Sequence, residues 1–180
     1  MVRIPGPVKR AVFLDRDGVL VEPIVRDDRF FGPTTLDEFR LFDDAPRQID
    51  RLRQAGFLCI LFTNQPDVSR GLLPVAVLDQ MHQVLRSRIA LDDLLVCHHD
   101  DHHRCRCRKP NPGMIFEAQE KWGIDLKNSF AVGDRWRDID AGRAAGCRTV
   151  LIEYPYSHCR AADFNVSNLV EAVDIVLTNR

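Results

Sequence analysis

Short apolar runs alternate with longer segments bounded by proline or glycine along most of the chain. Continuous apolar runs indicate strands that are covered on both faces, as in a parallel sheet. We expect such strands at 11–14, 57–62, 94–96, 129–132 and 148–152. We expect helices at 45–55, 74–89, 111–123, 135–146 and 167–177. This alternation predicts an α/β fold with a doubly wound parallel sheet and helices on both faces, in one domain spanning 1–180.

The segment 22–42 is the longest stretch without such a pattern, and it mixes prolines, Gly32 and isolated aromatic residues. It predicts a long loop with room for a hairpin, and loops of this length inside compact domains are often functional. We expect it to lean over the carboxyl ends of the strands. The helix after it should start at Asp43 or Asp44, either of which can cap it, and should bury Ile49 and Leu52.

Composition narrows the class of protein. The 180 residues, 45% hydrophobic and 28% charged, suffice for one α/β core and are few for two. The net charge of −1 gives no reason to expect a nucleic-acid or membrane partner. No apolar run approaches the roughly 20 residues of a membrane span, and the polar residues 1–9 predict no signal peptide. We expect a cytoplasmic protein that works as a monomer, although no residue pattern decides the oligomeric state.

Polar side chains follow three of the predicted strands and precede one predicted helix. They are Asp15 and Asp17, Thr63 and Asn64, Asp134 and Asp138, and, before the helix, Arg108 and Lys109. The carboxyl ends of parallel strands form the crevice in which α/β sheets bind ligands. Neighbouring carboxylates repel unless a cation neutralises them, Mg²⁺ prefers such oxygen ligands, and lysine neutralises phosphate. The four polar clusters together predict a site for magnesium and phosphate. Each cluster alone also fits an ordinary turn, helix start or solvated pair.

Three of the six cysteines lie in one loop, 97–107, together with four histidines. In a reducing cytosol this spacing favours a metal over disulfides. Tetrahedral zinc takes four cysteine or histidine ligands, so the loop can supply one complete site. The alternative is a set of free thiols beside a solvated histidine run. A nucleic-acid patch is a weaker interpretation, because no aromatic residues interleave with the basic ones.

Four segments carry a resemblance to a known family. They are Asp15-Arg16-Asp17-Gly18-Val19, Thr63-Asn64-Gln65, Lys109-Pro110, and Gly133-Asp134 with Asp138. From about residue 12 to residue 151 the chain resembles the haloacid-dehalogenase-like (HAD) phosphatases. Through Cys-Arg-Lys-Pro-x-Pro-Gly-Met at 107–114 it resembles subfamily IIIA more closely, in the branch of D-glycero-D-manno-heptose 1,7-bisphosphate phosphatase and histidinol-phosphate phosphatase.

The motif spacing leaves no room for the large cap domains of many relatives, so the resemblance implies a capless HAD core. Specificity would then come from the loops at 22–42, 66–73 and 97–107. The implied activity is that of a Mg²⁺-dependent phosphatase that forms an aspartyl-phosphate intermediate. Asp15 would be the nucleophile, Asp17 the general acid and base, and Thr63 and Lys109 would hold the transferring phosphoryl group. Magnesium would bind Asp15, Asp134 and the backbone carbonyl of Asp17.

The resemblance also assigns the remaining site residues. Asp138 would orient Lys109 or a metal-bound water. The implied substrate-binding residues are Asn64, Arg70, Arg108 and Arg135. The implied Zn²⁺ ligands are Cys97, His99, Cys105 and Cys107, with His98, His102 or His103 left open as replacements for His99.

The implied substrate is a phosphorylated sugar, heptose 1,7-bisphosphate cleaved at C7, with histidinol-phosphate as the alternative. The segment 66–71, Pro-Asp-Val-Ser-Arg-Gly, departs from the Ser-Gly-Ile-x-Arg-Gly that is frequent in the family. This departure leaves the substrate and its preferred anomer open. A zinc-stabilised binding module without catalysis is the alternative from another class, and the intact aspartates and Lys109 disfavour it.

Overall fold

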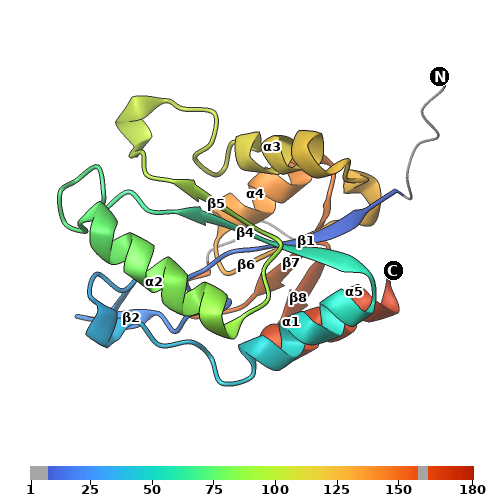
Figure 1. The fold of residues 1–180 in the computed structure, drawn as a ribbon, viewed down its shortest axis with the longest axis horizontal. Helices are drawn as coiled ribbons and strands as arrows, with labels where there is room; N and C mark the ends of the chain where they lie inside the picture. The colour runs from blue at the N-terminus through green and yellow to red at the C-terminus, as the bar shows by residue number, and fades with distance from the viewer. Residues whose placement is uncertain (1–7, 158–161) are drawn as a thin grey trace.

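The computed structural model describes residues 8–157 and 162–180, so the segment 1–7, for which we expected no signal peptide, lies outside the described residues. Its centre is a parallel sheet of six strands in the order β5-β4-β1-β6-β7-β8 (Figure 1). The strands are β1 (Arg10–Leu14), β4 (Phe57–Asn64), β5 (Asp93–Cys97), β6 (Phe130–Gly133), β7 (Arg148–Ile152) and β8 (Phe164–Val166). All but β8 match predicted strands, and each pairing is parallel.

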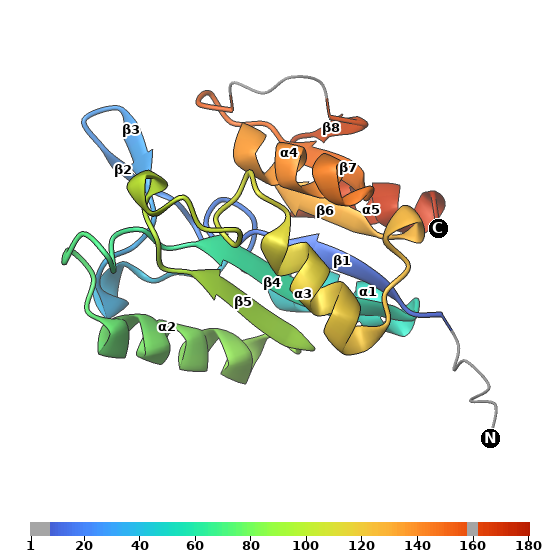
Figure 2. The same cartoon turned by 90° about the horizontal axis from the view of Figure 1, so that it is seen from above.

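Helices cover both faces of this sheet, as Figures 1 and 2 show. One face packs against α1 (Ala45–Gln54), α2 (Val75–Arg88) and α5 (Leu169–Thr178), and the other against α3 (Gly113–Trp122) and α4 (Trp136–Ala145). Side chains of β1 alternate between the two cores, with Val12 and Leu14 on the first face and Ala11 and Phe13 on the second. All four are fully buried. The predicted doubly wound sheet is confirmed.

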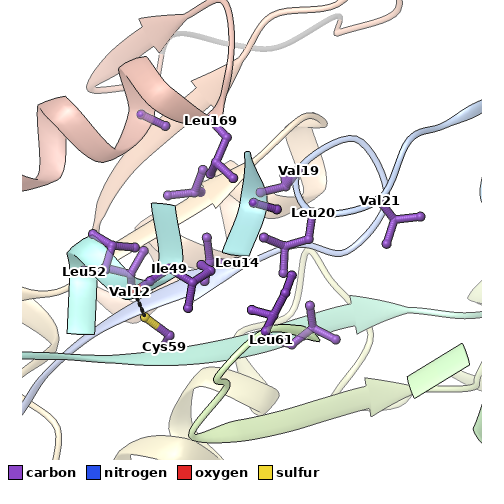
Figure 3. Close-up of a cluster of buried hydrophobic side chains, with 14 of the residues drawn as sticks. Val12, Leu14, Val19, Leu20, Val21, Ile49, Leu52, Cys59, Leu61 and Leu169 are labelled. Atoms are coloured by element: carbon purple, nitrogen blue, oxygen red, sulfur yellow. Dashed lines mark hydrogen bonds between the residues drawn. The ribbon is translucent and has the colours of Figure 1, made fainter. Parts of the chain in front are cut away.

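The larger core lies between β1, β4 and the helix α1 (Figure 3). Ile49 and Leu52 of α1 are fully buried, as predicted. The thiol of Cys59 donates to the carbonyl of Ile49 at 3.9 Å. The predicted side-chain cap of α1 was wrong: Asp44 occupies the N-cap position but accepts no capping hydrogen bond. Its own backbone is helical, with φ −87° and ψ −13°, whereas a capping residue needs an extended backbone.

The long loop does contain the predicted hairpin, and we call residues 24–31 the cover hairpin. It pairs β2 (Ile24–Arg26) with β3 (Arg29–Phe31) in antiparallel fashion. Its turn places Asp27 and Asp28 in the left-handed region, at φ 47° and 57°. Arg26 forms an ion pair with Glu38, in the short 3₁₀-helix Leu36–Glu38 that follows. Figure 2 shows the cover hairpin at the same end of the sheet as the loop after β5.

Candidate active site

Neighbouring strands bring the predicted aspartates together. Asp15 follows β1 and Asp134 follows β6, and these two strands pair in the sheet. Carboxylate oxygens of Asp15, Asp134 and Asp138 lie within 4.8 Å of one another. Lys109 is 2% exposed, and its Nζ donates to Asp15 Oδ1 at 2.7 Å and to the Phe62 carbonyl at 2.8 Å. The same Nζ lies 2.5 Å from Asp138 Oδ1.

Two glycines allow this close approach. A Cβ at Gly18, whose φ is +83°, would collide with the carboxylate of Asp134. A Cβ at Gly133 would collide with the side chain of Asp138. Only glycine adopts such positive φ values without strain and leaves room for a carboxylate against the backbone. The glycines of both motifs therefore serve the packing of the carboxylates.

The electrostatics of this centre call for additional positive charge. The three buried carboxylates have Lys109 against Asp15 and Asp138, and only the half-exposed Arg135 near Asp134, at 3.8 Å. Burial raises the pKa of Asp15 to about 6, with Lys109 opposing the rise and Asp138 adding to it. Burial also raises the pKa of Asp134 well above its usual range, and the charges of Asp138 and Asp15 raise it further. Burial alone would lower the pKa of Lys109, but the charges of Asp138 and Asp15 outweigh it.

One buried oxygen is free to bind a cation. Asp134 is 1% exposed, and its Oδ1 makes no hydrogen bond with any part of the chain that the structure describes. Leaving a buried carboxylate oxygen unpaired is costly, and a cation removes that cost. Magnesium prefers hard oxygen ligands from one or two carboxylates. The residues at this centre therefore fit Mg²⁺.

Both oxygens of Asp138 are already used by the protein. Oδ1 pairs with Lys109, and Oδ2 accepts a hydrogen bond from the backbone N–H of Arg135 at 2.9 Å. This arrangement agrees with the prediction that Asp138 orients Lys109. Sequence reasoning left its role undecided between Lys109 and a metal-bound water.

The carboxylate of Asp17 belongs to a separate network of buried side chains. Arg16, fully buried, donates from Nε to Asp17 Oδ1 at 2.9 Å and from Nη2 to Oδ2 at 3.0 Å. Gln65 donates from Nε2 to Asp17 Oδ2 at 3.0 Å and to the hydroxyl of Thr63 at 2.9 Å. Sequence reasoning missed the roles of Arg16 and Gln65. Their positions inside the quoted motifs were the available signal.

Thr63 and Asn64 end β4 beside this centre. The side chain of Asn64 makes two hydrogen bonds with the backbone of Lys109. Its Nδ2 donates to the Lys109 carbonyl at 3.0 Å, and its Oδ1 accepts from the Lys109 N–H at 3.0 Å. Asn64 thus fixes the segment that carries Lys109 to the end of β4. Thr63 is 1% exposed and lies beneath the surface.

An open cleft of about 640 Å³ lies above these residues. Residues from all three predicted specificity loops line it, among them Thr34, Leu72 and Asp101. The arginines that line it are the predicted Arg70, Arg108 and Arg135, and the additional Arg26 and Arg137. Five aspartates, Asp15, Asp17, Asp67, Asp101 and Asp138, line the cleft as well, so the five arginines and Lys109 exceed the carboxylates by one charge. The arginines still place several cationic groups within reach of a bound anion.

Two aspartates of the loop 97–107 hold the arginines in place. Arg70 Nε donates to Asp100 Oδ2 at 2.7 Å. Asp101 Oδ1 accepts from Arg108 Nε at 2.7 Å and from Arg137 Nη1 at 2.8 Å. These arginines lower the pKa of both aspartates. Sequence reasoning did not single out Arg137, because nothing in its spacing shows that α4 directs it to the cleft.

The four predicted zinc ligands converge. Cys97 Sγ lies 3.1 Å from Cys107 Sγ and 3.6 Å from Cys105 Sγ, and His99 Nδ1 lies 3.4 Å from Cys107 Sγ and 3.7 Å from Cys97 Sγ. The ligand atoms of a tetrahedral zinc site lie about 3.5–3.8 Å apart. His103 is engaged elsewhere, since its Nδ1 accepts from the Asp100 N–H at 3.0 Å. The cluster fits zinc, with His99 as the histidine ligand.

The loop after β7 contacts Asp134, and no pattern in the sequence predicted these contacts. Tyr156 donates its hydroxyl to Asp134 Oδ2 at 2.6 Å. Ser157 donates its hydroxyl to the Asp134 carbonyl at 2.5 Å. Tyr154 donates to the Gly18 carbonyl at 3.1 Å. Three hydroxyl groups from one loop thus fix the backbone and carboxylate at the centre.

The chain is similar to known phosphatases of one family. Residues 106–158 match a HAD-hydrolase-like family model. The chain is 37% identical over 147 residues to the D-glycero-β-D-manno-heptose-1,7-bisphosphate 7-phosphatase of Pseudomonas aeruginosa, covering 79% of this chain and 80% of that one. It is 30% identical over 196 residues to the D-glycero-D-manno-heptose-1,7-bisphosphate 7-phosphatase of Thermosynechococcus vestitus, covering 94% and 96%.

A solved structure agrees as well. The D,D-heptose 1,7-bisphosphate phosphatase of B. bronchiseptica, crystallised with magnesium and phosphate, superposes with a TM-score of 0.81 at 28% identity. The match covers 95% of this chain and 99% of that one. Among the described residues, none of the helices has the length and apolar character needed to cross a membrane.

Proposed function

Because the chain belongs to the HAD phosphatase family that includes the heptose-1,7-bisphosphate 7-phosphatases, we propose that it removes the C7 phosphate of D-glycero-D-manno-heptose 1,7-bisphosphate. One observation carries the catalytic part of this proposal. Lys109 Nζ contacts both Asp15 and Asp138 within 2.7 Å, and a carboxylate oxygen of Asp134 lies within 4.8 Å of oxygens of both aspartates. A nucleophilic carboxylate, a fixed cation and a metal-binding carboxylate thus share one end of the sheet.

We propose that the reaction has two steps. The carboxylate of Asp15 attacks phosphorus in line, and the bond between phosphorus and the C7 oxygen breaks. Asp17 gives a proton to the leaving C7 oxygen and then removes one from the attacking water. That water breaks the Asp15–phosphate bond, which regenerates the carboxylate and releases inorganic phosphate. Lys109 neutralises charge on Asp15 and on the phosphoryl oxygens, and Thr63 helps to hold the phosphoryl group.

Two metal ions belong to the proposal. Asp15, Asp134 and the backbone carbonyl of Asp17 would hold Mg²⁺, which offsets phosphate charge and orients the phosphoryl group for attack. Cys97, His99, Cys105 and Cys107 would hold Zn²⁺ in a closed structural site with four protein ligands. That site lies directly before Arg108 and Lys109 in the chain and would fix the segment that carries them.

The five arginines that line the cleft offer donors for a second phosphate on the substrate. Arg70, Arg108 and Arg135 would contact the part of the substrate that does not react, while Asn64 acts through the backbone of Lys109. We propose that the chain works as one domain in the cytoplasm, where a zinc site with three thiolates remains reduced.

Phosphate release from a matched panel tests the proposal. The panel contains both anomers of heptose 1,7-bisphosphate, histidinol-phosphate and an aryl phosphate, each with Mg²⁺ and zinc-loaded protein. We expect a preference of a hundredfold or more for one heptose anomer. A preference for histidinol-phosphate would keep the chemistry and overturn the substrate assignment.

Two variants serve as controls for the same panel. Asp15→Asn should release no phosphate from any substrate. Asp174→Asn, which changes an exposed carboxylate paired with Arg51, should behave like the wild type. If folded wild-type protein were silent on all four compounds, the binding-module alternative would replace the enzyme.

A further inference from the structure

The two carboxylate oxygens of Asp134 have different surroundings. Oδ2 accepts the hydroxyl of Tyr156 at 2.6 Å, and the Nε of Arg135 lies 3.8 Å from the same oxygen. Oδ1 is buried and has no hydrogen-bond partner in the described parts of the chain. A short charge-assisted hydrogen bond from a hydroxyl to a carboxylate is a strong one. As long as it persists, Asp134 offers a cation one oxygen rather than two.

Tyr156 is held so that its hydroxyl cannot easily turn away. Its ring lies 5.1 Å from the ring of Tyr154, nearly parallel to it, and 4.2 Å from the ring of Phe30 in the cover hairpin. The guanidinium of Arg135 lies 4.8 Å above its centre, and Arg135 Nη2 also donates to the Phe30 carbonyl at 3.0 Å. These ring and guanidinium contacts restrict the phenol while its hydroxyl is bonded to Asp134.

One-oxygen coordination distinguishes the two common hard cations. Mg²⁺ requires a compact octahedron at about 2.0–2.1 Å and takes single oxygens from its carboxylates. Ca²⁺ takes six to eight oxygens at about 2.3–2.6 Å and gains from carboxylates that supply both. A carboxylate with one oxygen already bonded thus suits Mg²⁺ and deprives Ca²⁺ of a ligand.

We propose that Tyr156 is a positioning residue that limits Asp134 to one-oxygen coordination and thereby makes the site select Mg²⁺ over Ca²⁺. The inference rests on the magnesium site of the proposed function. It concerns metal choice, not the identity of the substrate. Groups that orient metal ligands from behind in this way change metal affinity by about 10–100-fold when they are removed.

Metal titration without substrate tests the inference. Zinc-loaded wild type, Tyr156→Phe and Tyr154→Phe are titrated with MgCl₂ and with CaCl₂, and the unfolding midpoint gives an apparent Kd for each ion. Tyr154→Phe is the matched control, because it removes a hydroxyl from the same loop that bonds to a carbonyl instead of Asp134. We expect Tyr156→Phe to weaken Mg²⁺ binding about tenfold or more and to leave Ca²⁺ binding unchanged or tighter, because the second oxygen of Asp134 becomes free. Tyr154→Phe should keep the wild-type ratio within about twofold.

Phosphate release adds a second readout. The Mg²⁺ concentration for half-maximal rate should rise in Tyr156→Phe more than kcat falls at saturating Mg²⁺. An unchanged ratio of Mg²⁺ to Ca²⁺ affinity in folded Tyr156→Phe overturns the inference, as does an equal loss for both ions. If that variant does not fold, Tyr156→Leu replaces it, and a wild type that binds Ca²⁺ as tightly as Mg²⁺ overturns the inference by itself. A wild type that selects Mg²⁺ but hydrolyses no member of the panel overturns the proposed function only.

Discussion

Replacing Asp15 with Asn should stabilise the magnesium-free protein while abolishing turnover. Asp15 and Asp138 are buried carboxylates that share Lys109, and Asp134 is a third buried carboxylate close to both. In the variant, Lys109 keeps its contacts to Asp138 and to the Phe62 carbonyl, so no cation is left unpaired. The variant loses a buried negative charge whose ionisation the folded state disfavours.

The pKa of Asp15 sets the size of the effect. It is about 6 in the folded protein, against 3.8 for an ordinary aspartate, so the folded state binds the proton more tightly. The unfolding free energy therefore falls as pH rises from about 4 through about 6. Above about pH 6 Asp15 is ionised in both states, and the loss of stability reaches its full value. Two pKa units at about 1.36 kcal/mol each give a cost of about 3 kcal/mol at neutral pH. Of this, on the order of 1 kcal/mol develops between pH 5 and pH 8.

Urea unfolding of zinc-loaded wild type and Asp15→Asn, without added Mg²⁺, measures the difference directly. The variant should gain on the order of 1 kcal/mol on the wild type between pH 5 and pH 8. Adding Mg²⁺ should stabilise the wild type more than the variant. Asp174→Asn, at an exposed position, should follow the wild-type pH dependence. Parallel pH profiles for wild type and Asp15→Asn, or a wild type that is more stable at pH 8, would refute the reasoning.

Two further substitutions, each with a control variant, test the packing at Gly18 and the proposed zinc ligands. Gly18→Ala should cost on the order of 1–3 kcal/mol in urea unfolding from backbone strain, and more from its collision with Asp134. Gly71→Ala, at φ +71° with open space around it, should show the strain alone, and equal costs for both would contradict the collision. Cys107→Ser should reduce bound zinc from one ion per chain to nearly none in elemental analysis, with a lower unfolding midpoint. Cys147→Ser, outside the loop 97–107, should retain zinc, and a zinc-loaded Cys107→Ser would contradict the ligand set.

Much of the fold could be predicted because the strands of a parallel sheet are buried on both faces. Their apolar runs are continuous, so β1, β4 and β7 stand out from the chain on their own. The strand β8 was missed because it has three residues, Phe164–Val166, of which only Val166 is buried. An edge strand this short carries no pattern of its own.

Some residues of the candidate site could be predicted from the sequence and others could not. Asp15 and Asp134 could be predicted because each directly follows a strand, and parallel strands bring their ends together. Tyr156 could not, because its contact with Asp134 depends on the path of the loop after β7. Arg16 could be seen in the motif, but its burial against Asp17 follows from packing that no local pattern records.

The position of β1 in the sheet has a consequence for the synthesis of the protein. It is the first strand of the sheet to leave the ribosome, yet it lies in the middle, between β4 and β6. The edge of β1 that pairs with β6 has no partner during the seconds that the ribosome needs to proceed from β4 to β6. Open apolar edges invite pairing with other chains, so the nascent chain is vulnerable during this interval. Asp15 meets Asp134 only after this edge closes, so a chain that stalls before β6 has one half of a metal site and no activity.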